Sequence, residues 1–496
     1  MTDTVTDTFV PSAAAMLTAL RAGEVVDATA LYIDGGWTRS DSTNRISVVS
    51  PATEQVIAEV ADGSTADVDR AVAAARAALP AWSALSGAER GAYLKRVGEL
   101  ITERLDDFAE IASRDVGAPP EASKLVQLGL PIFNFGYYAN LAAAYDFDGE
   151  QVGNSLVVKE PIGVVACITP WNFPAHQVAL KVAAAFAAGC TVVVKPSEVA
   201  PLLVFAIAEL FDEVGLPAGV FNLISGVGTT VGEALVAHPD VDMVSFTGST
   251  RAGKQIAAVA AGTVKRVALE LGGKSANVVL DDADMNAAIG EGVANSIGLN
   301  CGQACTALTR VLVPAERLAE AEAVAKQIVD AYTIGAWDEE GTVIGPLVSE
   351  VQRDKVVDYI RKGIDEGARL VTGGLDSGRS TGYFVAPTVF SDVNNEMTIA
   401  REEIFGPVIA ILPYVDEADA VRIANDTVYG LAAAVWSGNK DRALRVARQL
   451  RAGQVQVNGG AFNPAAPFGG YKQSGLGREA GSMGIEEFLE TKAIQL

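Results

Sequence analysis

A regular alternation between residues 163 and 280 constrains the fold of this chain more than any other feature. Six short runs rich in β-branched residues occur in order there: GVVACIT, TVVVK, VFNLI, DMVSF, VKRVALE and ANVVL. The segments between the first five, including Pro201–Val214 and Thr229–Ala237, have helical character. Short strands separated by helices are typical of a parallel sheet covered on both faces. The sequence therefore predicts an α/β fold with a doubly wound sheet.

A second αβ series follows Cys305, with a strand at 309–314 and helices at 316–331, 356–366 and 418–424. Upstream, residues 67–78 have helical spacing, and Ser86 with Glu89 forms a capping box that predicts one long helix whose apolar face runs from Leu94 to Phe108. Because single cores stop growing near about 250–300 residues, a chain of 496 residues is expected to contain two or three domains.

Two segments are expected to leave these series. Residues 146–161, DFDGEQVGNSLVVKEP, have the pattern of an antiparallel excursion, and the terminal FLETKAIQL predicts an edge strand that pairs across a subunit interface. Residues before Leu31 form an extension with one predicted helix, Ala13–Arg21.

The charge balance excludes some classes of partner. Lys and Arg number 38 against 61 Asp and Glu, a net charge of −23, which argues against nucleic acid and against anionic membranes. The apolar run 178–194 contains Lys181 and Gly189 and is better explained as helix, turn and strand than as a membrane span. Four cysteines without a CxxC pair, and an N-terminus (MTDTVTDTFV) without signal-peptide character, predict a cytoplasmic protein.

Two groups between Val267 and Arg310 indicate chemistry. Glu270 ends a strand pattern before two glycines, and Cys305 follows Gly302 and Gln303. A thiol that forms a covalent intermediate and a carboxylate that activates water are a recognised division of labour. A free Cys is more often a small buried hydrophobe, and spacing does not choose between Cys305 and Cys301. No metal site is predicted, because the only two histidines, His176 and His238, lie in unrelated segments.

Other motifs have both a functional and a structural interpretation. Phe246–Gly253 (FTGSTRAG) is a strand–turn–helix pattern able to bind a phosphate, or a plain tight turn. Lys195 ends a strand at the edge where open α/β sheets bind ligands. It either contacts a ligand there or is a charged residue exposed to solvent. Asn172, in TPWNFP, has an amide able to donate to an oxyanion, or forms an Asx-turn.

Taken together, these stretches resemble the aldehyde dehydrogenase superfamily over nearly the whole chain from about Leu31. Seven motifs occur in the family's order: PIGVVACITPWNFP, VVVKPSE, FTGSTRAG, LELGGK, GQACTALTR, EEIFGP and PFGGYKQSGLGRE. The resemblance implies a Rossmann-type dinucleotide-binding domain (31–145 and 162–271), an αβ catalytic domain (272–484) and a small β oligomerisation arm (146–161 and 485–496), after an N-terminal extension (1–30). It also implies a homodimer or homotetramer.

The resemblance implies a role for each catalytic residue. Cys305 would be the nucleophile, and Cys301 a bystander. Asn172, with the main-chain N–H of Cys305, would hold the oxyanion of the thiohemiacetal. Hydride transfer would leave a thioester, and Glu270 would activate the water that releases the acid.

The resemblance also assigns the coenzyme. Lys195 and Glu198 would hold the adenine-side ribose, Ser249 the pyrophosphate and Glu403 the nicotinamide ribose. Glu198 favours NAD, because a carboxylate accepts hydrogen bonds from a free 2′-hydroxyl and repels a 2′-phosphate, although NADP stays possible. The full set is Ile168, Thr169, Pro170, Trp171, Lys195, Ser197, Glu198, Gly228, Phe246, Gly248, Ser249, Glu270, Leu271, Gly272, Cys305, Glu403 and Phe405.

The implied substrate channel is apolar and aromatic, and we expect no Arg or Lys beside the loop GGAFNPAAPFGG to anchor a carboxylate. An aliphatic or aromatic aldehyde is therefore expected. Two alternatives are a CoA-acylating semialdehyde dehydrogenase, which Glu270 argues against, and a catalytically silent NAD-binding protein of the same fold. A third, a cofactor-free cysteine hydrolase, lacks a His near the thiol. The channel residues are Phe173, Gln177, Leu180, Leu299, Phe462 and Phe468, with His176 nearby.

Overall fold

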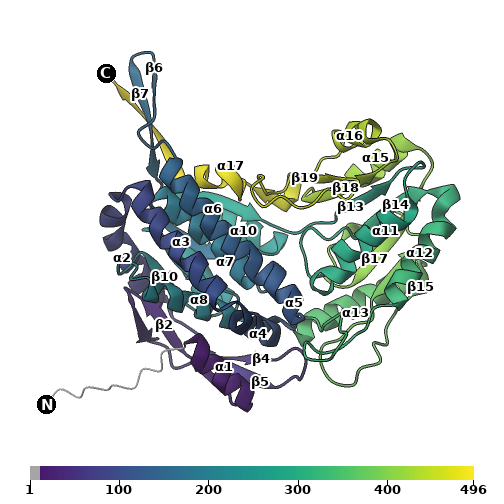
Figure 1. Ribbon diagram of the computed structural model, residues 1–496, viewed down its shortest axis with the longest axis horizontal. Coiled ribbons are helices and arrows are strands. Elements are labelled where there is room, and N and C mark those ends of the chain that lie inside the picture. Colours follow the sequence, from purple (N-terminus) through teal and green to yellow (C-terminus); the bar gives the residue numbers. More distant parts are fainter. Residues whose placement is uncertain (1–11) are drawn as a thin grey trace.

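The computed structural model describes residues 12–496 and contains two large sheets in separate halves of the molecule (Figure 1). The first sheet has eight strands in the order β20-β12-β11-β8-β9-β10-β2-β3. Its five central strands are parallel, as predicted, and the other three pair antiparallel. The strands are β2 (Ala30–Ile33), β3 (Gly36–Arg39), β8 (Val164–Ile168), β9 (Thr191–Lys195), β10 (Phe221–Leu223), β11 (Met243–Thr247), β12 (Arg266–Glu270) and β20 (Gly475–Leu476).

Alternate residues of these strands face two separate cores, because side chains along a strand point to opposite faces. In β8, Val165 and Cys167 pack into one core, and Val164 and Ala166 into the other. The predicted doubly wound α/β architecture is therefore confirmed. The first core contains α3 (Gly87–Glu103), α4 (Leu105–Val116), α6 (Leu130–Ala144), α7 (Pro174–Ala188) and α8 (Leu202–Glu213); the second contains α2 (Thr65–Ser83), α9 (Glu233–Ala237) and α10 (Thr250–Ala260).

The predicted single long helix after Ser86 is wrong. The capping box of Ser86 and Glu89 does open α3, but Arg104 leaves the helical conformation (φ −114°, ψ 23°) and a new helix, α4, begins at Leu105. The apolar residues on both sides of Arg104 still reach one core. The spacing of the apolar residues therefore predicted their burial correctly. The same spacing gave no sign that the chain breaks at Arg104.

The second sheet has seven strands in the order β15-β16-β17-β14-β13-β18-β19, all parallel except β15. Its strands are β13 (Ala276–Val279), β14 (Arg310–Pro314), β15 (Arg369–Thr372), β16 (Thr388–Ser391), β17 (Val408–Tyr414), β18 (Ala432–Trp436) and β19 (Gln454–Val457). Its helices are α11 (Met285–Val293), α12 (Leu318–Asp330), α13 (Glu350–Asp365), α14 (Thr398–Arg401), α15 (Glu417–Asn425) and α16 (Lys440–Ala447).

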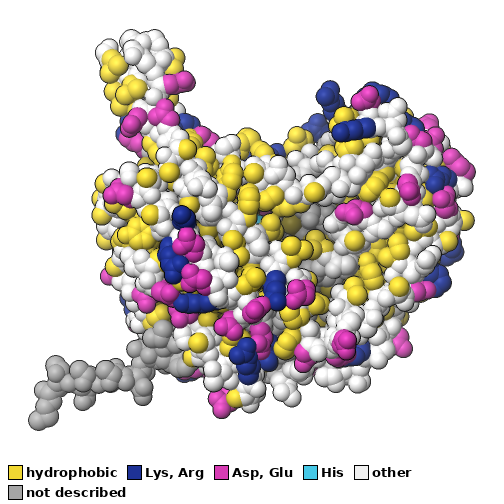
Figure 2. All heavy atoms as spheres, in the orientation of Figure 1, with side chains coloured by type: hydrophobic (Ala, Val, Ile, Leu, Met, Phe, Trp, Pro, Cys, Tyr) yellow, Lys and Arg dark blue, Asp and Glu magenta, His cyan; other side chains and the backbone are white. Residues whose placement is uncertain are grey.

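A third sheet forms an arm that projects from the body (Figure 1). The predicted terminal strand is confirmed as β21 (Leu489–Gln495), which pairs antiparallel with β7 (Ser155–Pro161) of the same chain. β7 also pairs with β6 (Glu150–Val152). Hydrophobic side chains lie on the arm surface (Figure 2), including Val152 and Ile494, which are 56% and 41% exposed.

The N-terminal helix packs against the body. Helix α1 (Ala13–Ala22) buries Met16, Leu17 and Leu20 in the first core. Residues 1–11 of the predicted extension, with the segment used to exclude a signal peptide, lie outside the described residues. Among residues 12–496, no helix is long and apolar enough to cross a membrane. Further elements include β1 (Val26–Ala28), β4 (Arg45–Val49), β5 (Val56–Ala61), α5 (Pro120–Ala122), a π-helical turn η1 (Ser123–Gly129) and α17 (Gly481–Glu486).

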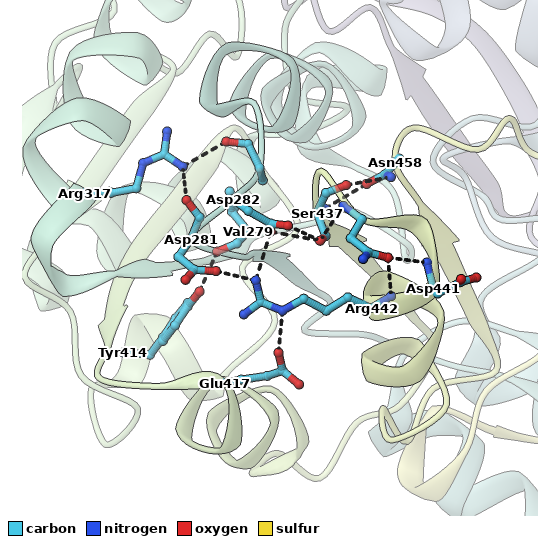
Figure 3. A network of polar contacts seen from close by, with 12 residues as sticks. Val279, Asp281, Asp282, Arg317, Tyr414, Glu417, Ser437, Asp441, Arg442 and Asn458 are labelled. Atoms are coloured by element: carbon cyan, nitrogen blue, oxygen red, sulfur yellow. Dashed lines mark hydrogen bonds and ion pairs between the residues drawn. The ribbon is translucent and has the colours of Figure 1, made fainter.

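A polar network closes the carboxyl edge of the second sheet (Figure 3). Arg442, on α16, binds the carboxylates of Asp281 and Asp282 beyond β13 and of Glu417 on α15. Ser437, beyond β18, donates to Asp282 at 2.9 Å. These groups satisfy one another, so this edge of the second sheet is occupied by structural contacts.

Candidate active site

A cavity lies between the two sheets and is lined by residues from both. The first sheet contributes its carboxyl edge, through the loops that follow β8, β11 and β12. The second contributes its amino edge, because Gly272 precedes β13 and Cys305 precedes β14. The lining residues are Pro170, Trp171, Asn172, Gln177, Thr247, Gly248, Ser249, Glu270, Leu271, Gly272, Cys305, Gln352, Lys355, Glu403 and Phe405.

The two neighbouring thiols have different surroundings. Cys305 lines the cavity, whereas Cys301 is buried in the core of the second sheet and donates its S–H to the carbonyl of Gly345 at 3.2 Å. The loop between them needs glycine at Gly302, where φ is +73° and a Cβ would lie 2.1 Å from the carbonyl oxygen of Gly406. Only one of the two thiols is therefore open to a ligand.

The Cys305 thiol is protonated at neutral pH in the free protein. Burial raises its pKa to about 12, and the carboxyls of Glu270 and Glu403 add to this increase. The main-chain N–H groups of Cys305 and Thr306 act in the opposite direction. Because the thiolate is the reactive form, a positive charge brought close to this sulfur would activate it.

Hydrogen bonds hold both the side chain and the main chain of Asn172. Its Nδ2 donates to the carbonyl of Gln303 at 2.9 Å. Its own carbonyl accepts from Gln127 Nε2 at 2.9 Å and from Asn300 Nδ2 at 3.0 Å. An amide nitrogen has two hydrogens, so one of those on Asn172 stays free for a ligand.

Glu270 ends β12 and is 4% exposed. Both of its carboxyl oxygens are buried without a hydrogen-bond partner among residues 12–496. Burial raises the pKa of Glu270 well above its usual value, and the charge of Glu479 raises it further. An unpaired carboxyl with this environment is suited to accept a proton.

A buried ion pair that sequence reasoning missed adds to the electrostatics of Glu270. Lys181 is fully buried and donates to the carboxylate of Glu479. The positive charge of Lys181 lowers the pKa of Glu270, against the effect of Glu479. The sequence contained one signal for this pair, a single lysine in the stretch 178–188 of helix α7, which is otherwise apolar.

A second cavity lies beside the first sheet, and its lining fits the adenine side of a dinucleotide. Glu198 lines it and accepts from Lys195 Nζ at 3.0 Å. A Cβ on Gly228 would meet no atom within 4 Å, so a larger side chain there would occupy the cavity. Of the predicted coenzyme residues, Ile168, Glu198, Gly228 and Phe246 line it, and Arg251 and Ala252 of the motif FTGSTRAG do so as well. The lining residues that were not anticipated are Val227, Thr229, Gly232, Glu233, Val236, Gln255, Ile256 and Val259.

The turn between the two cavities carries a helix N-terminus. Ser249 caps α10 and accepts from the N–H of Ala252 at 3.2 Å. The N-terminus of an α-helix presents free N–H groups and a partial positive charge, which fits a pyrophosphate. Three predicted residues line neither cavity: Thr169 and Lys195 are buried, and Ser197 accepts from the N–H of Val199 at 3.2 Å.

The predicted nicotinamide side is held by main-chain contacts. The carboxylate of Glu403 accepts from the N–H of Gly273 at 3.0 Å. Phe405 has a left-handed conformation (φ 61°), and its ring packs edge-on against Trp171 at 5.3 Å. Gln352 donates to the carbonyl of Phe405 at 2.6 Å. Gln352 and Lys355 line this cavity and were missed, because they belong to no motif recognised in the sequence. Thr247 also lines it and was not singled out, although it lies within the motif FTGSTRAG.

The predicted substrate residues are distributed over more than one surface. Gln177 lines the main cavity, and its Oε1 has no partner among the described residues. Phe173 packs with Ala304 and Ala307, next to Leu299, and Leu180 is buried on α7. Phe462 lines a separate hollow, and the centre of its ring lies 6.4 Å from that of the Phe468 ring. His176 contacts Asn134 and is not part of the cavity lining.

The expectation that no basic residue lies beside the loop of Phe462 is wrong. Arg478 lines the same hollow as Phe462 and Asn463. Its Nη1 donates to the carbonyls of Gly470 and Gly477, at 3.2 and 2.6 Å. Arg478 lies outside the loop in sequence and comes beside it through the tertiary fold. Among residues 12–496, no group of three or more His, Cys, Asp or Glu side chains could hold a metal ion.

Comparison with known proteins gives consistent matches over this chain. The family model described as "Aldehyde dehydrogenase family" matches residues 37–494. A 3-succinoylsemialdehyde-pyridine dehydrogenase of a Pseudomonas species is 50% identical over 471 residues, which cover 93% of this chain and 97% of that protein.

Solved structures also match this chain over nearly its whole length. A cysteine-to-alanine mutant of aldehyde dehydrogenase C of Pseudomonas syringae, complexed with NAD+ and octanal, is 50% identical, with a TM-score of 0.93 over 94% of this chain and 96% of that one. The NAD+ complex of an aldehyde dehydrogenase of Bacillus cereus is 39% identical, with a TM-score of 0.91 over 95% and 96%.

Proposed function

This chain belongs to the aldehyde dehydrogenase family, and we propose that it oxidises an aldehyde to a carboxylic acid with NAD through a covalent intermediate on Cys305. The observation that carries the proposal is the cavity between the sheets. It brings together a thiol, an amide with a free N–H and an unpaired carboxyl, on Cys305, Asn172 and Glu270.

In the first step the thiol of Cys305 gives its proton to water, and the resulting thiolate attacks the carbonyl carbon of the aldehyde. The electron pair of the C=O bond moves to oxygen, where negative charge develops. The free N–H of Asn172 and the main-chain N–H of Cys305 donate to this oxygen. Such donors accelerate reactions because they are oriented before the charge forms.

When bound, NAD would supply the hydride acceptor that oxidises the thiohemiacetal to a thioester on Cys305. The residues proposed to hold NAD are Glu198 and Lys195 at the adenine-side ribose, Ser249 and the N-terminus of α10 at the pyrophosphate, and Glu403 at the nicotinamide ribose.

In the last step water attacks the thioester. Glu270 takes a proton from that water, the new C–O bond forms, and the C–S bond breaks with its electron pair on Cys305. This role needs the ionised form of Glu270, although burial favours the neutral form. The presence of this carboxyl supports water, and not CoA, as the acyl acceptor.

The coenzyme proposal favours NAD. Glu198 lines the adenine-side cavity and would repel a 2′-phosphate. Arg251 lines the same cavity and would attract one, which supports NADP as a second coenzyme. The NAD+ complexes of the P. syringae and B. cereus relatives support NAD first.

An aliphatic or aromatic aldehyde is the proposed substrate. The apolar ring of Phe173 lies beside the loop of Cys305, packed against Ala304. The P. syringae relative was crystallised with octanal. Arg478 supports acidic aldehydes as a second class, because its guanidinium lines the hollow that holds Phe462.

The proposal extends to location and assembly. All four cysteines of the chain are free, which supports the reducing cytoplasm. The projecting arm has exposed apolar side chains and free strand edges, which support assembly into dimers or tetramers.

The test is NADH formation with a panel of aliphatic, aromatic and carboxylated aldehydes, with NAD and NADP in parallel and with or without CoA. We expect turnover without CoA, faster with NAD. Turnover that requires CoA would replace hydrolysis by acyl transfer. Protein that binds NAD and oxidises none of the panel would contradict the proposed substrate class.

A further inference from the structure

We propose that Asn300 is a positioning residue, which fixes the oxyanion donor Asn172 in place relative to the nucleophile Cys305. The inference rests on the proposed function, because it gives Asn300 a purpose only if Asn172 polarises the aldehyde. The side-chain Nδ2 of Asn300 donates to two main-chain carbonyls, that of Asn172 at 3.0 Å and that of Gln303 at 3.3 Å.

These two carbonyls belong to different loops. Asn172 follows β8 in the first sheet, and Gln303 is two residues before Cys305 in the loop that leads to β14. An amide nitrogen has two hydrogens, one for each carbonyl. Asn300 therefore ties the loop of the oxyanion donor to the loop of the nucleophile.

The backbone at Asn300 has an unusual conformation that makes this contact possible. Asn300, Cys301 and Gly302 have consecutive positive φ angles of 50°, 57° and 73°. Left-handed conformations cost most residues free energy, and Asn and Gly tolerate them best. Persistent unfavourable backbone conformations cluster at functional sites, where the surrounding contacts hold them.

The carbonyl of Gln303 also orients the side chain of Asn172. It accepts from Asn172 Nδ2 at 2.9 Å and from Asn300 Nδ2 at 3.3 Å. The side chain of Gln303 is held in turn, because its Nε2 donates to the carbonyl of Asn300 at 3.0 Å and its Oε1 accepts from the N–H of Val348 at 2.9 Å. These hydrogen bonds select which of the two hydrogens of Asn172 remains free.

Gln127 is the second donor to the carbonyl of Asn172. It is 2% exposed, comes from the π-helical turn η1, and donates at 2.9 Å. The side chain of Gln127 donates to the loop of Asn172, whereas the side chain of Asn300 donates to both loops. We therefore assign the coupling between nucleophile and oxyanion donor to Asn300, with Gln127 as support.

The test is a double-mutant cycle with Asn172→Ala and Asn300→Asp. Asp keeps the size of Asn and replaces the two N–H donors by an oxygen that both carbonyls repel. A misplacement of about 1 Å in a catalytic site can lower the rate by about 100-fold, so we expect Asn300→Asp to lower kcat by roughly 10–100-fold, with NAD affinity unchanged. In the Asn172→Ala protein the same change should lower kcat by less than about 3-fold, because coupled residues are not additive.

Asn425→Asp is the matched control. Asn425 also bridges main-chain groups, donating to the carbonyl of Gln449 at 2.9 Å and accepting from the N–H of Arg451 at 2.7 Å, but it does not line the cavity. Its kcat should stay within about 2-fold of the wild-type value, as for sites with no shared partners. Asn300→Gly, which tolerates the positive φ and lacks the amide, repeats the test if Asn300→Asp does not fold.

The outcomes separate this inference from the proposed function. If Asn172→Ala leaves kcat unchanged, the oxyanion role of Asn172 and the inference both fail. If Asn172→Ala lowers kcat and the Asn300 variants do not, the inference alone fails. The inference also fails if the double mutant loses kcat by the product of the two single-mutant factors, because Asn300 would then act independently of Asn172.

Discussion

At the residue scale, burial shapes both reactive groups of the site. Cys305 and Glu270 are each more stable in their neutral form, because the cavity is poorly solvated and both lie near other carboxyls. The active forms, thiolate and carboxylate, are the charged ones. The free protein therefore keeps its nucleophile and its base neutral, and a bound positive charge would shift the thiol toward its reactive form.

Replacing the two neighbouring thiols should have opposite results. Cys305→Ala removes the nucleophile and should abolish oxidation, whereas Cys301→Ala should retain nearly all of it, since Cys301 is packed in the core of the second sheet. Steady-state NADH formation with octanal measures both. Equal loss in the two variants would contradict the assignment of the nucleophile.

The raised pKa of Glu270 predicts a pH dependence. Only the ionised form accepts a proton from water, so kcat should fall as the pH drops through this raised pKa, well above the usual carboxylate range near about 4. In Glu270→Gln this acid limb should disappear, and a single burst of NADH should be followed by slow turnover.

Glu479→Gln is the companion variant. It removes a negative charge that raises the pKa of Glu270 and leaves Lys181, which lowers that pKa. The acid limb should therefore move to lower pH. An unchanged limb would mean that another group controls the profile.

At the element scale, the sequence predicted the helix cap and the strands well, but it did not predict where a helix breaks and the chain changes direction. The capping box at Ser86 opened a helix as expected, whereas the break at Arg104 was missed. A capping box is a contact between residues three positions apart in the sequence, so the sequence alone can predict it. The position of a break depends on the core against which the next helix packs, and segments far away in the sequence form that core.

The network around Arg442 should contribute modestly to stability. The guanidinium contacts three carboxylates, but two of these are 37% exposed and the third is 59% exposed. Exposed ion pairs are worth about 0–1 kcal/mol each, so Arg442→Ala should lower the free energy of unfolding by about 1 kcal/mol, and by less at high salt.

Thermal melts at low and high salt measure this effect. Arg361→Ala, which removes one isolated surface pair with Asp358 at 2.9 Å, is the control and should change the melting temperature less. A larger loss in the control would show that the network adds nothing beyond its separate pairs.

At the scale of the whole molecule, the site exists only because two sheets meet. The carboxyl edge of the first sheet and the amino edge of the second line one cavity. The carboxyl edge of the second sheet, where ligands of open α/β sheets commonly bind, is closed by the network around Arg442. The two sheets therefore contribute opposite edges, and Cys305 and Glu270 come together across the boundary between them.

The projecting arm predicts an assembly that a single substitution can weaken. Ile494→Asp places a charge on the exposed face of β21, which should destabilise a subunit contact and shift the protein to smaller species in light scattering. Val415→Asp, at a position 80% exposed on the body, is the control and should leave the mass unchanged. Equal masses for wild type and Ile494→Asp would contradict a role for the arm.

The sequence by itself determined the sheet-and-helix order, the caps and the family, because these depend on periodicity, on residues a few positions apart and on short motifs. The motifs already favoured Cys305 over Cys301. Only the tertiary structure decided that Cys301 packs in the core of the second sheet, that Lys181 pairs with Glu479, and that Arg478 lies beside the loop of Phe462. Each of these depends on contacts between segments far apart in the chain. Burial and charge at the site come from the same contacts, so the raised pKa values of Cys305 and Glu270 also became visible only in the folded protein.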